Sequence, residues 1–426
     1  MKTKFTLKII FIICILYNVA NAQTYTSVAN GSWLNPLIWS PTPPAPFFVP
    51  ILGVNATAVI INTNVTVDTV FTYTTGTLTI NKGKSLSEGT KPRGFLVNGG
   101  TFTNNGTFNF NSFGSQAGTA TNHGVMNINF VFYNNINFLN DSNILGVDSF
   151  QNDKVITNTN KAHIVASKFL NNKTIVNNGV IDATDFLNAD SLYNNGRLNF
   201  TNFTNSQKCI NDSLIIFNDF INFGNFENND EIQGNRDFLN WGFFNNKNYN
   251  SFVSIARNFL NVDSTLHKAV FNNDGYVHIA HDWLNIDTVK GTTGQFQIGD
   301  STANLGYMKG SFDFCDSTPP PSSPYIDFNS GTIDPGITYC LNVKTADYSI
   351  SKQIKIYPNP VNDFLRIENG GNELRLIEVY DLLGNIALQS NYKNIIDVSQ
   401  LPDGIYLINI IDVKYNSVKS KLVVEH

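Results

Sequence analysis

The side chains best suited to chemistry gather at His278-Ile279-Ala280-His281-Asp282, close to Asp274. Imidazole and carboxylate groups in such a cluster could hold a metal ion or transfer protons. On an extended strand, however, His278 and His281 point to opposite faces, so joint metal binding would need a bend between them. We therefore interpret this segment as a solvated edge and predict no catalytic residue, no metal and no cofactor in this chain.

Three aspartates, Asp185, Asp219 and Asp237, lie next to aromatic residues in the middle of the chain. Enzymes that cleave polysaccharides need carboxylates that converge on one face, to bind calcium or to act as acid and base. Each of these aspartates instead lies one or two residues from a predicted turn, a position where aspartate bonds to nearby backbone. We predict that the three aspartates form turns.

The first residues have the pattern of a signal peptide. Lys2, Lys4 and Lys8 precede an apolar run over residues 9–16, and the small-x-small triplet Ala20-Asn21-Ala22 follows. We predict that residues 1–22 are removed before Gln23. The apolar run is about half as long as a membrane-spanning helix, and no later stretch comes close to that length, so we expect no transmembrane segment.

The charge of the predicted mature chain argues against nucleic acid as a partner. The sequence has 28 basic and 33 acidic residues, and loss of the three signal lysines leaves 25 basic residues and a net charge of about −8. A nucleic-acid footprint needs a basic surface. Because only 14% of residues are charged and 42% are hydrophobic, the chain must instead bury a sizeable core.

Three cysteines remain once Cys14 leaves with the signal peptide: Cys209, Cys315 and Cys340. An odd number cannot all be paired. Cys315 and Cys340 lie on either side of a Pro-rich segment. In an oxidising compartment this arrangement leaves two alternatives open, a disulfide between them or free thiols.

A repeat of about 17 residues organises the middle of the chain. The aromatic column slips by one residue at its fifth member, and looser copies follow at Phe259 and Trp283. Cys209 shares a column with apolar residues, so we predict a buried thiol. The columns are the aromatic residues Phe169, Phe186, Phe203, Phe220 and Phe238; the asparagines two residues later, Asn171, Asn188, Asn205, Asn222, Asn240, Asn261 and Asn285; the apolar sets Ile175, Leu192, Cys209, Phe226 and Phe243, and Ile181, Leu198, Ile215, Ile232 and Tyr249; and the asparagines Asn177, Asn194, Asn211, Asn228 and Asn245.

Equal spacing of several columns is what stacked coils require, because each side chain then lies above its equivalent one strand spacing away. We therefore predict an all-β protein with a parallel β-helix, or β-solenoid, over residues 55–345, in coils of roughly 17–24 residues. Apolar columns would fill the interior, and the Asn columns would bond to turn backbone and to each other. Gly179 and Gly196 would supply left-handed turn conformations. This pattern of equally spaced apolar and Asn columns resembles that of the pectin-lyase-like class of β-helices.

Residues 23–54 form a lead-in with Gly31-Ser32-Trp33 and Trp39, followed by a Pro-rich stretch. The segment resembles the start of many Bacteroidetes β-helix proteins. Its physical role would be to cap the open end of the stack, which would otherwise expose strand edges.

Residues 353–426 follow a short linker, 346–352, and change to the alternating pattern of a small Ig-like β-sandwich with about seven strands. The motif residues are Tyr357, Pro358, Asn359 and Pro360, then Gly384, and finally Gly404 and Tyr406. In this order they resemble the type A sorting domain of the Bacteroidetes type IX secretion system. Without the resemblance, Pro358 and Pro360 would stiffen a turn, and the two glycines would relieve hairpin turns.

The resemblance implies passage across the outer membrane by the type IX secretion machinery, followed by removal of the domain and attachment of the passenger to a surface lipopolysaccharide anchor. We therefore expect a secreted or outer-membrane-attached protein at the cell surface. Three functions stay open, in this order: a structural or adhesive solenoid without catalysis, a solenoid that binds an extracellular glycan, and a polysaccharide lyase or hydrolase.

Overall fold

The computed structural model describes residues 24–40, 51–55, 57–89, 94–263, 268–318, 326–340, 354–368, 374–381, 386–412 and 417–426. The predicted signal peptide, the predicted linker and Gly384 lie outside these residues. The chain divides into two compact units, residues 1–342 and residues 343–426. No helix in the described part is long and apolar enough to cross a membrane.

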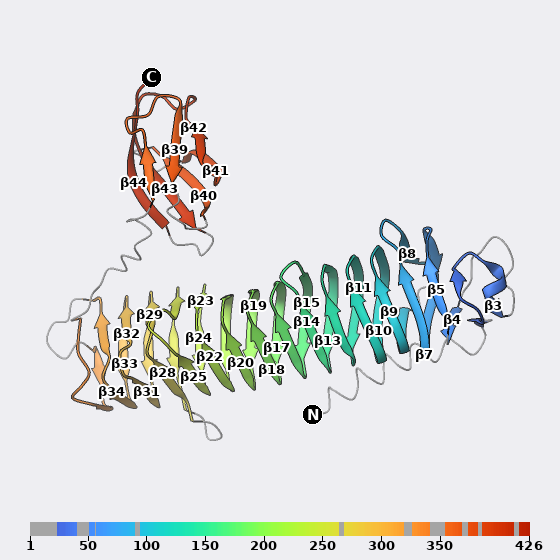
Figure 1. Ribbon diagram of the computed structural model, residues 1–426. Coiled ribbons are helices and arrows are strands. Elements are labelled where there is room, and N and C mark those ends of the chain that lie inside the picture. Colours follow the sequence, from blue (N-terminus) through green and yellow to red (C-terminus); the bar gives the residue numbers. More distant parts are fainter. Residues whose placement is uncertain are drawn as a thin grey trace. The chain divides into compact units, whose positions relative to one another are not determined.

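The first unit is a parallel β-solenoid, which confirms the predicted fold class (Figure 1). Its N-terminal part contains, among the described residues, one short helix, η1 (Pro36–Ile38), and eight strands. They are β1 (Thr24–Ser27), β2 (Gly31–Ser32), β3 (Trp39–Ser40), β4 (Ile51–Asn55), β5 (Ala58–Ile61), β6 (Val65–Val67), β7 (Thr69–Ile80) and β8 (Ser85–Glu88). Except for β1 with β3, every pairing between its named strands is parallel.

Three long strands follow, β9 to β11, and from β11 to β22 long and short strands alternate along the chain. They are β9 (Gly94–Asn104), β10 (Thr107–Asn122), β11 (Val125–Asn134), β12 (Asn137–Asn140), β13 (Asn143–Asn152), β14 (Val155–Asn158), β15 (His163–Asn171), β16 (Thr174–Asn177), β17 (Val180–Asn188), β18 (Ser191–Asn194), β19 (Arg197–Asn205), β20 (Lys208–Asn211), β21 (Leu214–Asn222) and β22 (Asn225–Asn228).

From β23 onward the two halves of the long strands are separate. These strands are β23 (Glu231–Gly234), β24 (Phe238–Asn240), β25 (Phe243–Asn246), β26 (Phe252–Ile255), β27 (Phe259–Asn261), β28 (Val270–Asn273), β29 (Tyr276–Ile279), β30 (Trp283–Asn285), β31 (Thr288–Gly291), β32 (Gln295–Ile298), β33 (Thr302–Asn304), β34 (Tyr307–Gly310), β35 (Asp313–Asp316), β36 (Phe328–Asn329) and β37 (Thr332–Ile333).

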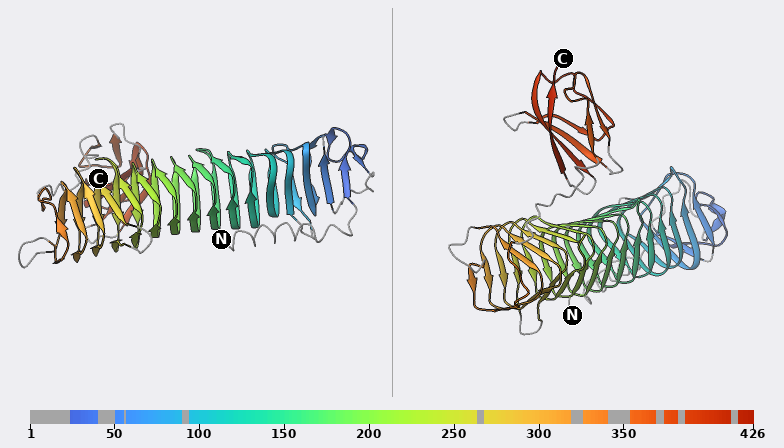
Figure 2. Two further views of the ribbon diagram at one scale, coloured as in Figure 1. Left: turned by 90° about the horizontal axis from the view of Figure 1, so that it is seen from below. Right: turned by 60° about the vertical axis from the view of Figure 1, so that its left-hand side comes forward.

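Each coil in the regular part has three straight segments, so the solenoid has three faces. Figure 2 shows the coils stacked one upon another. The first face stacks the first halves of the long strands and continues into β23, β26, β29, β32 and β35. The second face stacks their second halves and continues into β24, β27, β30, β33 and β36. The third face stacks the short strands from β12 to β37.

The aromatic column lies inside the solenoid, beneath the second face. Phe150 and Phe169 stack with ring centroids 4.2 Å apart, and Phe203 and Phe220 stack at 4.7 Å. Both pairs are almost completely buried. Cys209 is fully buried in a neighbouring column, as predicted, and burial raises the pKa of its thiol well above the ordinary value.

Two ladders of buried asparagine run along the interior at the corners of the coils, which confirms the predicted role of the Asn columns. In each ladder the side-chain Nδ2 donates to Oδ1 of the asparagine one coil further on, over 2.7–2.9 Å. Asn177, for example, donates to Asn194, and also to the carbonyl oxygens of Gly179 and Arg197. The same side chains thus join successive coils and satisfy corner carbonyls that would otherwise be buried without partners.

Near their C-terminal end, the predicted columns are out of register with the structure, so this part of the prediction was wrong. Asn246, and not Asn245, continues the Asn ladder, and Phe244, and not Phe243, continues the apolar column. One additional residue at the corner before Phe238 shifts Phe238, Phe244 and Asn246 by one. Tyr249 is 71% exposed in a longer corner, and Val253 takes the interior place assigned to it.

Gly179 and Gly196 do not adopt left-handed backbone conformations, so that prediction was wrong. They are glycine because successive coils approach closely at this corner. A Cβ on Gly196 would lie 2.2 Å from the carbonyl oxygen of Gly179 and 2.7 Å from the carbonyl carbon of Asn178.

Gly196→Ala is therefore expected to lower the free energy of unfolding by about 1–3 kcal/mol, because the coils must move apart to admit the methyl group. Urea denaturation followed by circular dichroism measures this loss. Ser213 occupies the same corner one coil further on, and Ser213→Ala should change stability by less than about 0.5 kcal/mol. Equal losses for the two variants would contradict close approach as the reason for glycine.

The lead-in covers the N-terminal end of the core. β1 and β2 stack in parallel on β4 and β5. Trp33, Ile38 and Trp39 are each at most 2% exposed. The indole N–H of Trp39 donates to the carbonyl oxygen of Trp33 over 3.0 Å, which fixes the two rings edge to face.

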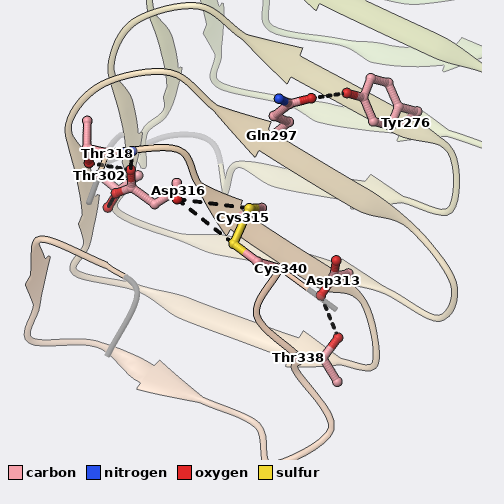
Figure 3. Close-up of a disulfide and its surroundings, with 9 residues drawn as sticks. All are labelled: Tyr276, Gln297, Thr302, Asp313, Cys315, Asp316, Thr318, Thr338 and Cys340. Atoms are coloured by element: carbon pink, nitrogen blue, oxygen red, sulfur yellow. Dashed lines mark hydrogen bonds between the residues drawn. A yellow bond between two sulfur atoms is a disulfide. The ribbon is translucent and has the colours of Figure 1, made fainter. Parts of the chain in front are cut away.

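The C-terminal end of the solenoid is closed by a segment that folds back onto the last coil (Figure 3). The amide of Phe314 donates to the carbonyl oxygen of Thr338, and the Thr338 hydroxyl donates to the carboxylate of Asp313 over 2.8 Å. Cys315 and Cys340 form a disulfide, which corresponds to the first of the two alternatives left open by the sequence. This cross-link ties the folded-back segment to β35.

The C-terminal unit consists of two small antiparallel sheets, in the orders β38-β39-β42 and β41-β40-β43-β44. The strands are β38 (Lys355–Tyr357), β39 (Phe364–Glu368), β40 (Leu374–Tyr380), β41 (Ile386–Asn391), β42 (Ile395–Asp397), β43 (Gly404–Asp412) and β44 (Ser417–Val424). Apolar side chains from both sheets form its own core, which includes Leu365, Ile377 and Ile408.

Candidate functional site

The Tyr357-Pro358-Asn359-Pro360 segment joins β38 to the rest of the C-terminal unit. Both X–Pro peptide bonds in it are cis. The side chain of Asn359 bonds to the last strand, because its Nδ2 donates to the carbonyl oxygen of Lys421 and its Oδ1 accepts from the amide of Val423, each over 2.8 Å. The motif asparagine thus substitutes for a strand residue where proline cannot donate.

The second half of the motif fixes a corner before β43. The hydroxyl of Tyr406 donates to the carbonyl oxygen of Pro402 over 2.8 Å, and the ring is 8% exposed. Gly404 begins β43 beside this ring. The predicted motif residues that the structure describes therefore support the sandwich from two sides, through β44 and through the corner before β43.

The comparisons agree with this geometry. Residues 355–425 match the protein family described as the secretion system C-terminal sorting domain. This part of the chain is a sorting domain. It implies export by the type IX secretion system and placement at the cell surface or outside the cell. No curated protein is significantly similar to the chain.

The His and Asp side chains of residues 274–282, which we interpreted as a solvated edge, do not converge on one point. His278 points outward from β29 and is half-buried, and burial lowers the pKa of its imidazole. His281 lies beyond the strand end, with Nδ1 4.0 Å from the carboxylate of Asp300. Asp274 accepts hydrogen bonds from the amide and hydroxyl of Thr292 over 2.6 and 2.8 Å. Within the described ranges, no three His, Cys, Asp or Glu side chains are placed to hold a metal ion.

Asp185, Asp219 and Asp237 lie at the corner between the first and second faces, and each bonds to the following coil. Asp185 accepts from Nδ2 of Asn202 over 2.7 Å, and Asp219 accepts from the amide of Asp237 over 3.4 Å. Hydrogen bonds from the guanidinium of Arg257 hold the pKa of Asp237 below its usual range. The bonds reach across coils, whereas the sequence predicted bonds within each turn.

The outward side of the second face carries a column of mostly aliphatic side chains. From Leu170 to Leu284 each lies between an interior aromatic residue and an interior asparagine, and every member stands in register above the previous one. Most are partly exposed, and Leu187 and Phe328 are 38% and 57% exposed. The column, here called the apolar column, is Leu170, Leu187, Thr204, Ile221, Leu239, Leu260, Leu284, Ala303 and Phe328.

The third face carries a different surface, on which aromatic rings lie beneath lysines. Lys208 Nζ lies 5.0 Å from the ring centroid of Tyr193, and Lys309 Nζ lies 4.9 Å from that of Tyr307. Lys290 Nζ lies 5.8 Å from the ring centroid of Phe243. These distances are within the range of cation–π attraction.

A shallow pocket of about 380 Å³ opens at the corner between the second and third faces, where Phe223, Phe243 and Lys268 line it. We refer to it as the corner pocket. The repeat did not reveal it, because Phe243 was assigned to the interior. The signals present in the sequence were the doubled aromatic Phe243-Phe244, and the aromatic-glycine pairs Phe223-Gly224 and Trp241-Gly242, which lie one coil apart.

Proposed function

We propose that the exported protein is an adhesive surface solenoid without catalytic activity, and that its apolar column is the main contact surface. The column extends over nine coils in unbroken register, from Leu170 to Phe328. At a rise of about 4.8 Å per coil, it is on the order of 40 Å long. Extended apolar patches on the surface of a folded protein mark interaction sites.

The Asn ladders suit such a role. A buried chain of amide hydrogen bonds holds each coil to the next, so the surface columns keep a fixed spacing. The sorting domain brings this solenoid out of the cell, and attachment to a lipopolysaccharide anchor would present it at the surface. Binding of an extracellular glycan is the second function we consider, because the third face exposes Phe243 and Tyr307 by 37% and 50%.

Adhesion and catalysis can be tested with one preparation, the purified chain from residue 23 to residue 426. We expect retention on polymer-coated and apolar beads without new reducing ends or unsaturated products, with and without calcium. The double variant Leu239→Ser and Leu260→Ser removes the centre of the apolar column and should weaken adhesion to apolar beads about thirtyfold, since each leucine loses a contact worth about 1 kcal/mol when half-buried.

The control for this experiment is Thr204→Ser, which lies in the same column and removes only one methyl group. Circular dichroism shows whether each variant keeps its strands. Cleavage of any polymer would show that the protein is an enzyme. If the double variant adheres as well as the unchanged protein, the apolar column is not the contact surface.

A further inference from the structure

The corner pocket combines two aromatic rings with three polar side chains that point into solvent. Phe223 and Phe243 line it from successive coils, and Gln207, Asn225 and Lys268 surround them. Its volume of about 380 Å³ is at the lower end of the range of about 300–1,000 Å³ typical of small-ligand sites. The pocket is therefore large enough for a small ring-shaped ligand.

Two glycines keep this corner open. Gly224 and Gly242 occupy the corner position in successive coils, and a Cβ on Gly242 would lie 2.4 Å from the carbonyl oxygen of Gly224. No side chain therefore fills the space between the aromatic residues. Trp241 packs edge to face on Phe223, with centroids 4.8 Å apart, and holds that ring in place.

The polar side chains at the pocket are available for a ligand, unlike most amides on this solenoid. Elsewhere, outward asparagines bond across coils, as Asn272 does to Asn245 over 2.7 Å. Gln207, Asn225 and Lys268 are exposed, and their side chains make no hydrogen bond or ion pair with any residue that the structure describes. Amides of this kind can donate to and accept from sugar hydroxyl groups.

The one charged residue among those that line the pocket is a lysine, Lys268. Lys290 Nζ lies 5.8 Å from the centre of the Phe243 ring. Of the nearby carboxylates, Asp287 accepts from the amide of Ala269, next to Lys268, over 2.8 Å, and Glu227 pairs with Lys247 over 2.6 Å. Asp263 precedes the same corner but does not line the pocket.

We propose that the corner pocket binds an acidic polysaccharide, with a uronic acid ring stacked on Phe243 and its carboxylate paired with Lys268. The apolar face of a sugar ring fits the aromatic surface, and the free amides of Gln207 and Asn225 bond to its hydroxyl groups. This inference rests on the proposed adhesive function and adds to it a ligand class and a second, polar contact surface.

Binding of polygalacturonate to the chain of residues 23–426, with dextran as the neutral polymer, tests this site. We expect retention on polygalacturonate at low salt, and weaker retention on dextran. Phe243→Ala should lower the affinity for polygalacturonate about tenfold, which corresponds to about 1.4 kcal/mol of lost stacking. Lys268→Gln should lower it about threefold and reduce the dependence on salt, because a single exposed ion pair contributes little.

Tyr249→Ala and Lys168→Gln are the matched controls, since both residues are exposed on the solenoid and neither lines the pocket. They should bind polygalacturonate like the unchanged protein. Unchanged binding in both pocket variants, or equal retention of dextran, overturns this inference. If polygalacturonate is not retained while adhesion to apolar beads still depends on Leu239 and Leu260, the acidic-glycan site is wrong and the adhesive function stands.

Discussion

Asn194→Ala is expected to lower the free energy of unfolding of the solenoid by about 3–5 kcal/mol, because a buried polar group that loses its partner costs about 1–3 kcal/mol and this change affects several such groups. Asn194 Nδ2 donates to Asn211 over 2.8 Å and to the carbonyl oxygen of Gly196 over 3.0 Å. Its Oδ1 accepts from Asn177 over 2.8 Å. Urea denaturation of the chain from residue 23 to residue 426, followed by circular dichroism, measures the loss.

The adjacent residue gives a matched control. Asn195 is exposed, and its Nδ2 donates to Asn178 over 2.9 Å at the surface. Asn195→Ala should change stability by less than about 0.5 kcal/mol. Asn194→Asp keeps the size of the side chain but has no donor hydrogens when ionised, so it should be at least as damaging as Asn194→Ala. A loss below about 1 kcal/mol for Asn194→Ala would show that the ladder is not a main source of stability.

The ladder also explains why the fold could be predicted from the sequence. Side chains that stack one coil apart must recur at the length of a coil, and the equal interval from Asn177 to Asn194 and on to Asn211 is that length. Both asparagine and aromatic columns keep the interval because both are buried, where a shift of one residue would turn each side chain to the opposite face. Burial of these columns is therefore the reason why the length of a coil can be read from the sequence.

Corners carry no such constraint, and the errors of the prediction lie there. The additional residue before Phe238 and the longer corner around Tyr249 are exposed, so they alter spacing without disturbing the core. The corner pocket arises from this change, because the shifted register turns Phe243 outward and Phe244 inward. Gly196 illustrates a second limit. Glycine serves both for positive φ and for close backbone approach, and the sequence does not distinguish between these needs.

The sorting domain could be predicted for another reason. Its motif residues resemble those of the family in their order, and two of them have separate structural tasks: Asn359 makes two bonds to β44, and Tyr406 bonds to Pro402. The surface that contacts the secretion machinery has no such internal signature. Spacing within one chain reports contacts within that chain, so the partner surface of the domain could not be read from the sequence.

Removal of residues 355–426 is expected to abolish export and to leave the solenoid inside the cell envelope. The two units have separate cores, so the truncated solenoid should still fold. Immunoblots of culture medium, cell surface and periplasm from a host with the type IX secretion system measure the distribution. Appearance of the truncated chain in the medium or at the surface in normal amounts would show that the sorting domain is not required.

A single substitution can test whether export depends on the stability of the folded sorting domain and not only on its presence in the chain. Asn359→Ala removes two hydrogen bonds of 2.8 Å to β44 and should destabilise the domain by about 1–2 kcal/mol, a large share of the stability of so small a unit. Export should then fall in proportion to the unfolded fraction at the growth temperature. Asn391→Ala, at the exposed end of β41, removes the same side chain without these bonds and should export normally. The two variants differ in the bonds to the last strand. Lower export of Asn359→Ala alone would show that sorting depends on the bonds from Asn359 to β44. Equal export of the two variants would show that the secretion system does not need these bonds.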